Sequence, residues 1–242
     1  MTPKVITIAQ QKGGTGKTTL AVHLALAFIK YHNLKVAIID TDPQGSLGKW
    51  FMIRSEMNVA NGGLTFKTAS LWGAQYESKI LKQQHDIVII DTPPKIEADA
   101  RPAIEASDLV LIPISPSPVD FWATEPIIEI AKRAKKRVVI QINRANPRAK
   151  LMKKTYADIE VDLTKIEVQV DDEHTNRVIV DDKRKLGIVL KYPSLSLFKN
   201  PKDIGKSPEE AFKLVVNCID HIFEGEKIYP AKDSTEKELT AF

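Results

Sequence analysis

The residues best suited to chemistry stand in a glycine-rich segment near the start of the chain. A β-branched run at residues 5–9 leads into Gln-Gln-Lys-Gly-Gly-Thr-Gly-Lys-Thr-Thr at residues 10–19, and an apolar stretch suited to a helix follows. Glycines let consecutive backbone N–H groups turn towards one anion, and the start of a helix adds positive partial charge. In a loop of this pattern, Lys17 contacts the β- and γ-phosphates of a nucleotide and the Thr18 hydroxyl ligates Mg²⁺. We therefore interpret the segment as a phosphate-binding loop, with a glycine-rich turn that binds nothing as the alternative.

Acidic residues follow two further apolar runs. Asp40 comes after residues 36–39, Asp91 comes after residues 87–90, and Asp42 stands two positions beyond Asp40. The carboxyl ends of parallel strands are where open α/β sheets bind ligands, and carboxylates there can hold Mg²⁺ directly or through water. The alternative is that one of these residues caps a helix that begins near residue 44, and Asp42 before Pro43 suits that role.

The elements that must position these residues indicate an α/β protein. Short runs that are apolar on both faces suit strands buried in a parallel sheet, and helix-like segments lie between them. We expect a doubly wound, mostly parallel sheet flanked by helices. The expected strands cover residues 5–9, 36–39, 64–69, 87–90, 109–114 and 138–142, and the expected helices cover residues 18–31, 44–54, 71–83 and 126–135.

The second half of the chain has weaker patterns. Residues 149–158 look helical, residues 165–170 alternate like a strand, residues 174–185 suggest a turn into a helix, and residues 207–223 suggest a final amphipathic helix. We expect a single domain over residues 1–228 and a polar tail over residues 229–242.

Composition limits the class of protein. The chain has 242 residues, of which 43% are hydrophobic and 27% charged, which excludes a mainly disordered or fibrous protein. Its apolar runs are far shorter than the roughly 18 residues of a membrane span, and its start lacks a signal-peptide pattern. The one cysteine, Cys218, cannot form an internal disulfide. We therefore expect a cytoplasmic protein.

The positive charge is concentrated in one segment. Residues 132–154 hold ten of the 35 basic residues and none of the 31 acidic ones, so the rest of the chain is net acidic. A basic patch of this kind attracts polyanions, whereas solvated helix faces and helix ends are the alternatives.

The phosphate-loop segment, read as Lys12-Gly13-Gly14-Thr15-Gly16-Lys17-Thr18, resembles the deviant Walker A motif of the ParA/MinD family of P-loop ATPases. It departs from the standard Walker A pattern because Gln11 replaces the first glycine and Lys12 is an additional lysine. Residues 39–46 resemble the family's second acidic motif, and residues 90–94 resemble its Walker B motif. Residues 115–120 and 142–144 also stand where the family has similar strings. The resemblance is specific over residues 4–144 and loose beyond about residue 150.

The resemblance implies a P-loop fold of the SIMIBI type that binds ATP and Mg²⁺ and hydrolyses ATP to ADP and phosphate. Lys12 would reach the partner's nucleotide across a homodimer. Lys17 would stabilise the negative charge that develops on the γ-phosphate oxygens, and Asp42 would position the attacking water. Asn143 would contact adenine, with a turn residue as the alternative. The implied metal site consists of Thr18, Asp40 and Asp91. The implied nucleotide contacts come from Lys12, Gly13, Gly14, Thr15, Gly16, Lys17, Thr18 and Thr19.

ParA-type partition proteins are the subgroup that the chain resembles most. The resemblance then implies that ATP closes a dimer that binds DNA non-specifically, associated with the nucleoid. A centromere-binding or other adaptor protein would stimulate hydrolysis. The candidate DNA contacts are Lys132, Arg133, Lys135, Lys136, Arg137, Arg148, Lys150, Lys153 and Lys154, with residues 183–185 as a rival basic cluster.

Two other functions within the family are the alternatives. One is a membrane-associated positioning ATPase like MinD, and the other is a ParA-like ATPase that positions a different cargo. The last ten residues contain few large apolar side chains, which counts against a membrane-binding helix. An enzyme with a dimer-bridging cluster, such as the nitrogenase iron protein, would need two cysteines in each chain.

Overall fold

The computed structural model describes residues 3–56, 63–94, 100–115, 117–145, 177–180 and 187–193. The strands in these ranges are β1 (Lys4–Ile8), β2 (Val36–Asp40), β3 (Leu64–Thr68), β4 (Ile87–Asp91), β5 (Leu109–Ile114), β6 (Arg137–Ala145), β7 (Arg177–Val180) and β8 (Gly187–Pro193). The helices are α1 (Lys17–His32), α2 (Ser46–Glu56), α3 (Leu71–Leu81), α4 (Arg101–Ala106), α5 (Pro118–Trp122) and α6 (Glu125–Arg133).

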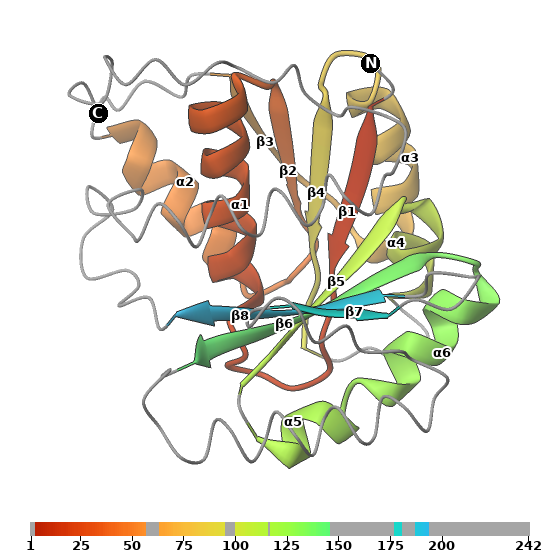
Figure 1. The fold of residues 1–242 in the computed structure, drawn as a ribbon. Helices are drawn as coiled ribbons and strands as arrows, with labels where there is room; N and C mark the ends of the chain where they lie inside the picture. Colours follow the sequence, from red (N-terminus) through yellow and green to blue (C-terminus); the bar gives the residue numbers. More distant parts are fainter. Residues whose placement is uncertain are drawn as a thin grey trace.

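The strands form one sheet in the order β3-β2-β4-β1-β5-β6-β8-β7. Every neighbouring pair is parallel except β7 with β8. Helices α1 and α2 lie on one face of the sheet, and α3 and α4 lie on the other (Figure 1). This arrangement confirms the expected doubly wound, mostly parallel sheet.

The prediction for residues 174–185 was wrong in part. Instead of a turn into a helix, residues 177–180 form β7, whose Val178, Ile179 and Val180 pair antiparallel with β8. Three consecutive β-branched residues favour a strand, and pairing with an already formed strand decides between the two conformations. The expected elements at residues 149–158, 165–170 and 207–223, and the tail at 229–242, lie outside the described residues.

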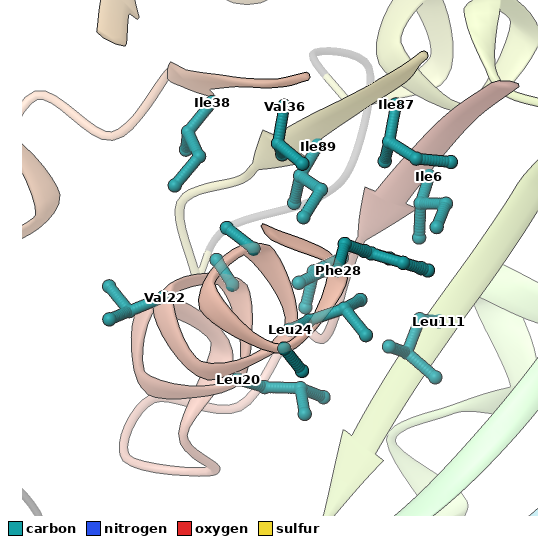
Figure 2. Close-up of a cluster of buried hydrophobic side chains, with 14 of the residues drawn as sticks. Ile6, Leu20, Val22, Leu24, Phe28, Val36, Ile38, Ile87, Ile89 and Leu111 are labelled. Atoms are coloured by element: carbon teal, nitrogen blue, oxygen red, sulfur yellow. The ribbon is translucent and has the colours of Figure 1, made fainter. Parts of the chain in front are cut away.

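The sheet is buried on both faces. Side chains that alternate along β1, β2 and β4 point towards α1, where Phe28 and Leu24 pack against Ile6, Ile87 and Ile89 (Figure 2). The intervening positions form a second cluster with Ala74 and Leu81 of α3 and Ala103 of α4. Burial on both faces explains why the strand sequences are continuously apolar rather than alternating.

This packing fixes where the central strands end. In the parallel register Asp40 of β2 lies beside Asp91 of β4, and Asp91 lies beside Ile8 of β1. The loop that joins β1 to α1 therefore starts at the same edge as the two carboxylates. The fold brings together residues that are some 50 to 80 positions apart in sequence.

Phe28→Ala tests whether the cluster under α1 holds this edge together. Phe28 is fully buried, so the substitution removes apolar contacts and leaves a cavity. We expect a loss of about 3–5 kcal/mol in the free energy of unfolding, measured by urea titration. Met52→Ala, at a side chain that is 60% exposed on α2, should change it by less than about 0.5 kcal/mol. Equal losses for both variants would contradict the assignment of this core.

Candidate nucleotide site

The loop between β1 and α1 has the backbone conformation that an anion site needs. Gly14 and Gly16 have φ values of 77° and 93°, in the left-handed region that glycine adopts without a steric penalty. Gly16 is the N-cap of α1, no side chain caps this end, and its first turn contains no acidic residue. The first N–H groups of a helix have no partner within the helix. They are therefore available to an anion together with the positive end of the helix dipole.

Lys17 brings a positive charge into this loop. Its side chain is buried, and Nζ donates hydrogen bonds to the carbonyl oxygens of Gln10 at 3.1 Å and Lys12 at 3.4 Å. Burial lowers the pKa of the ammonium group, and the nearby carboxylates of Asp91 and Asp42 partly oppose this shift. Phosphate oxygens would give this buried cation stronger partners than two carbonyls.

Asp91 and Thr18 form the polar contact between β4 and the start of α1. The Thr18 hydroxyl donates to Oδ2 of Asp91 at 2.6 Å, while the buried Oδ1 has no hydrogen-bond partner among the described residues. Asp91 is only 1% exposed. The pKa of this carboxyl is raised to about 7, mainly by burial and also by the charges of Asp40 and Asp42, while the Thr18 hydrogen bond and the charge of Lys17 oppose the shift.

These features fit a magnesium ion. Mg²⁺ takes oxygen ligands and in nucleotide sites is held by one or two protein groups together with phosphates and water. Thr18 would keep its lone pairs for the ion while donating its proton to Oδ2 of Asp91, whose Oδ1 has no hydrogen-bond partner among the described residues. No group of three or more His, Cys, Asp or Glu side chains within the described ranges could hold a metal.

Asp40 and Asp42 have different surroundings. Asp40 is buried and accepts backbone N–H bonds from Asp42 at 3.0 Å and from Gly48, in the first turn of α2, at 3.1 Å. Burial is the main cause of its raised pKa. Asp42 is more exposed and accepts the N–H of Gln44 at 2.9 Å within a turn that Gly45 closes. The capping role therefore fits Asp40, which accepts the N–H of Gly48 in the first turn of α2, better than Asp42.

Lys12 pairs with a residue that sequence analysis did not link to it. Its Nζ donates to Oδ1 of Asp120, which lies in α5, 108 positions away. Lys12 is 45% exposed at its side chain, whereas Asp120 is 2% exposed. Oδ2 of Asp120 accepts the N–H of Ser115 at 3.0 Å. The only indication in the sequence was that Asp120 is the last residue of the segment 115–120, which stands where the family has a similar string.

The remaining predicted nucleotide contacts lie in or near the loop. Gly13 and Thr15 are loop residues, Thr15 is buried, and Thr19 lies in the first turn of α1. Asn143 lies near the carboxyl end of β6, which is longer than predicted.

Five of the predicted DNA contacts lie around the start of β6. Lys132 and Arg133 end α6, and Arg137 begins β6, with Lys135 and Lys136 between them. β5 is parallel to both β1 and β6, so β6 runs in the same direction as β1. These five residues therefore lie at the amino edge of the sheet, opposite the phosphate loop. The other candidates, Arg148, Lys150, Lys153 and Lys154, and the rival cluster at residues 183–185, lie outside the described residues.

These features together define a P-loop nucleotide-binding site. They are a strand, a loop with two glycines in the left-handed region, a buried lysine and a Thr–Asp pair. Residues 6–189 match the family described as the CobQ/CobB/MinD/ParA nucleotide binding domain. The chain belongs to this family and is a partition-type ATPase of the ParA/MinD group. Residues 140–242 also match a second family, which is described as T4 bacteriophage base plate protein.

Two curated relatives illustrate the range of the family. Maintenance of carboxysome distribution protein A of Halothiobacillus neapolitanus is 28% identical over 161 residues, which cover 64% of this chain and 73% of that protein. Chromosome-partitioning ATPase Soj of Thermus thermophilus is 27% identical over 147 residues, which cover 50% of this chain and 57% of that protein.

Solved structures share the fold. A plasmid partition protein of Borrelia burgdorferi bound to AMPPNP has a TM-score of 0.64 at 21% identity, covering 92% of this chain and 98% of that one. The ParA of pNOB8 bound to nonspecific DNA has a TM-score of 0.63 at 16% identity, covering 93% and 99%. None of the described helices is long and apolar enough to cross a membrane.

Asp91→Asn tests the state of the buried carboxyl in the nucleotide-free protein. Because its pKa is near 7 when folded and 3.8 when unfolded, the folded state binds the extra proton between these values. The stability that depends on this proton is complete below about pH 4 and is lost as the pH rises through 7, by up to about 4 kcal/mol. Asp91→Asn should remove this decline in urea titrations from about pH 4 to pH 8. Asp108→Asn, at a half-exposed carboxylate, should retain it. Parallel profiles for Asp91→Asn and the unmodified chain would contradict the raised pKa.

Proposed function

We propose that this chain is a ParA-type positioning ATPase whose ATP-bound homodimer binds DNA without sequence preference and distributes a protein assembly as its cargo. The observation that carries the proposal is the pair of lysines in one phosphate loop. Lys17 is buried against the loop carbonyls, while Lys12 is half-exposed at the same edge of the sheet. Lys17 serves the protomer's own nucleotide, and Lys12 is accessible to a nucleotide held by a second copy.

The roles of the remaining groups follow from their surroundings. Thr18 and Asp91 would hold Mg²⁺, which would supply positive charge to the phosphates of ATP, and Asp40, which accepts an N–H at the start of α2, would support the ion through water. Asp42 orients the attacking water because it is the more exposed carboxylate at this edge. Asn143, at the end of β6, contacts adenine. ATP hydrolysis is slow until an adaptor protein stimulates it.

The basic residues at 132–137 and the phosphate loop lie at opposite edges of the sheet, and this separation suits DNA binding by a dimer. A dimer joined at the phosphate-loop edge leaves the amino edge of each protomer open, with the basic residues at 132–137. Lysine and arginine contacts to phosphates give binding that is independent of sequence and sensitive to salt. Two such edges in one particle bind with higher avidity than one, so affinity for DNA follows the ATP-bound dimer. The support from relatives is the ParA bound to nonspecific DNA.

Two comparisons favour a protein assembly as the cargo. One relative maintains carboxysome distribution, and residues 140–242 match a phage base plate protein, a component of a large protein particle. The second candidate is segregation of a plasmid or chromosome, which Soj and the plasmid partition protein support. A membrane-associated ATPase like MinD is the third.

DNA binding is the first test. We expect a non-specific duplex to bind with ATP but not with ADP or without nucleotide, and Asp42→Ala to stay bound because it does not hydrolyse ATP. Combining Arg133→Gln with Lys135→Gln should reduce the slope of log affinity against log salt by up to about 2. Lys67→Gln with Lys79→Gln, at exposed lysines on β3 and α3, is the matched control. Nucleotide-independent binding, or an equal effect of both double variants, would exclude this interface, and vesicle binding would then support the MinD-like candidate.

The cargo is tested in the native host. Deleting the gene should leave large protein assemblies clustered, while the retention of plasmids and the segregation of chromosomes stay normal. Fluorescence microscopy of tagged assemblies and plasmid-loss assays measure the two outcomes. Loss of plasmids or chromosomes with normally distributed assemblies would replace the proposed cargo with DNA.

A further inference from the structure

We propose that Asp120 is a positioning residue that holds Lys12 within its own protomer, so that ATP-dependent dimerisation requires Lys12 to exchange this carboxylate for the nucleotide of the partner. The inference rests on the proposed role of Lys12 and adds the group against which that role must compete.

The pair is asymmetric in burial. The Asp120 side chain is almost fully enclosed, and both of its oxygens are used, Oδ1 by the ammonium of Lys12 and Oδ2 by the N–H of Ser115 at 3.0 Å. Lys12 retains nearly half of its side-chain exposure. The carboxylate is therefore fixed in the interior, while the lysine can turn outward without disturbing packed groups.

The backbone around Asp120 holds it next to the phosphate loop. Its N–H donates to the carbonyl of Ser117 at 3.1 Å, and its own carbonyl accepts from Nε2 of Gln10 at 3.3 Å. The same Gln10 amide lies 3.4 Å from the carbonyl oxygen of Pro113 in β5. Gln10 thus joins the start of the phosphate loop to both β5 and α5, and this keeps Asp120 within reach of Lys12.

Release of Lys12 has a cost that a partner's nucleotide must offset. Removing one member of an ion pair leaves the other charge without compensation, and a buried charge loses more than an exposed one. A triphosphate offers more negative charge than one carboxylate, whereas a diphosphate lacks the terminal phosphoryl group. The Lys12–Asp120 pair therefore favours the single protomer, and it raises the requirement for ATP in dimerisation.

Asp120→Asn tests the competition, because the amide keeps the shape and its oxygen can still accept the Ser115 N–H. We expect the ATP concentration at half-dimerisation, measured by light scattering after size exclusion, to fall about three- to tenfold. Asp108→Asn is the matched control, because Asp108 also joins a lysine, Lys82 at 3.4 Å, to a backbone N–H, that of Val5 at 2.7 Å. Asp108 lies before β5, away from the phosphate loop, and this variant should dimerise like the unmodified chain.

Amine acylation followed by mass spectrometry reports on the contact without dimerisation. In the nucleotide-free chain Lys12 should react more slowly than the exposed Lys49, and Asp120→Asn should bring the two rates together. The first comparison needs no variant, so it holds even if Asp120→Asn does not fold. Equal rates in the unmodified chain would overturn the proposal.

The outcomes separate this inference from the function on which it rests. If ATP dimerises the unmodified chain but not Lys12→Ala, and Asp120→Asn dimerises with unchanged or higher ATP demand, the role of Asp120 is wrong and the proposed function stands. If ATP dimerises neither the unmodified chain nor Asp120→Asn, or if Lys12→Ala dimerises normally, the proposed role of Lys12 fails instead.

Discussion

Burial of the central strands on both faces fixes the positions of the polar groups in the nucleotide site. β1, β2 and β4 pack between α1 on one side and α3 with α4 on the other, so their register cannot change without exposing apolar side chains. That register ends with Asp40 beside Asp91 and with the phosphate loop next to both. The polar groups of the site are thus held at the rim of an apolar layer, where they cannot move apart to reduce their electrostatic cost.

The site consequently contains charges and hydrogen-bonding groups with incomplete compensation. Among the described residues, Oδ1 of Asp91 has no hydrogen-bond partner and the pKa of this carboxyl is raised, while the pKa of Lys17 is lowered and its Nζ donates hydrogen bonds to two carbonyl oxygens. An uncompensated α1 N-terminus adds to these costs. A bound magnesium–nucleotide complex would supply the opposite charges together, so its binding free energy would include relief of unfavourable electrostatics in the free protein. The same rigidity that destabilises the empty site prepares it for its ligand.

The two edges of the sheet separate two kinds of interaction. At the carboxyl edge lie the phosphate loop, the acidic residues and Lys12, while the basic residues at the junction of α6 and β6 lie at the amino edge. A partner bound at one edge does not cover the other. Under the proposed function, this arrangement would let the nucleotide control association at its own edge and affect the second surface through the number of protomers joined.

The sequence alone indicated β1 to β6, the helices α1, α2, α3 and α6, and the chemistry of the phosphate loop, because these depend on local patterns: β-branched runs, glycines at fixed spacing and carboxylates at strand ends. Tertiary structure alone decided which groups meet. Lys12 and Asp120 are 108 positions apart, and their contact depends on β1 lying beside β5. Asp40, rather than Asp42, reaches Gly48 because of how α2 packs. The direction of β6 places the basic residues at 132–137 at the amino edge of the sheet, and β7 forms where local patterning suggested a helix. Such contacts result from strand order and packing, which periodicity along the chain does not specify.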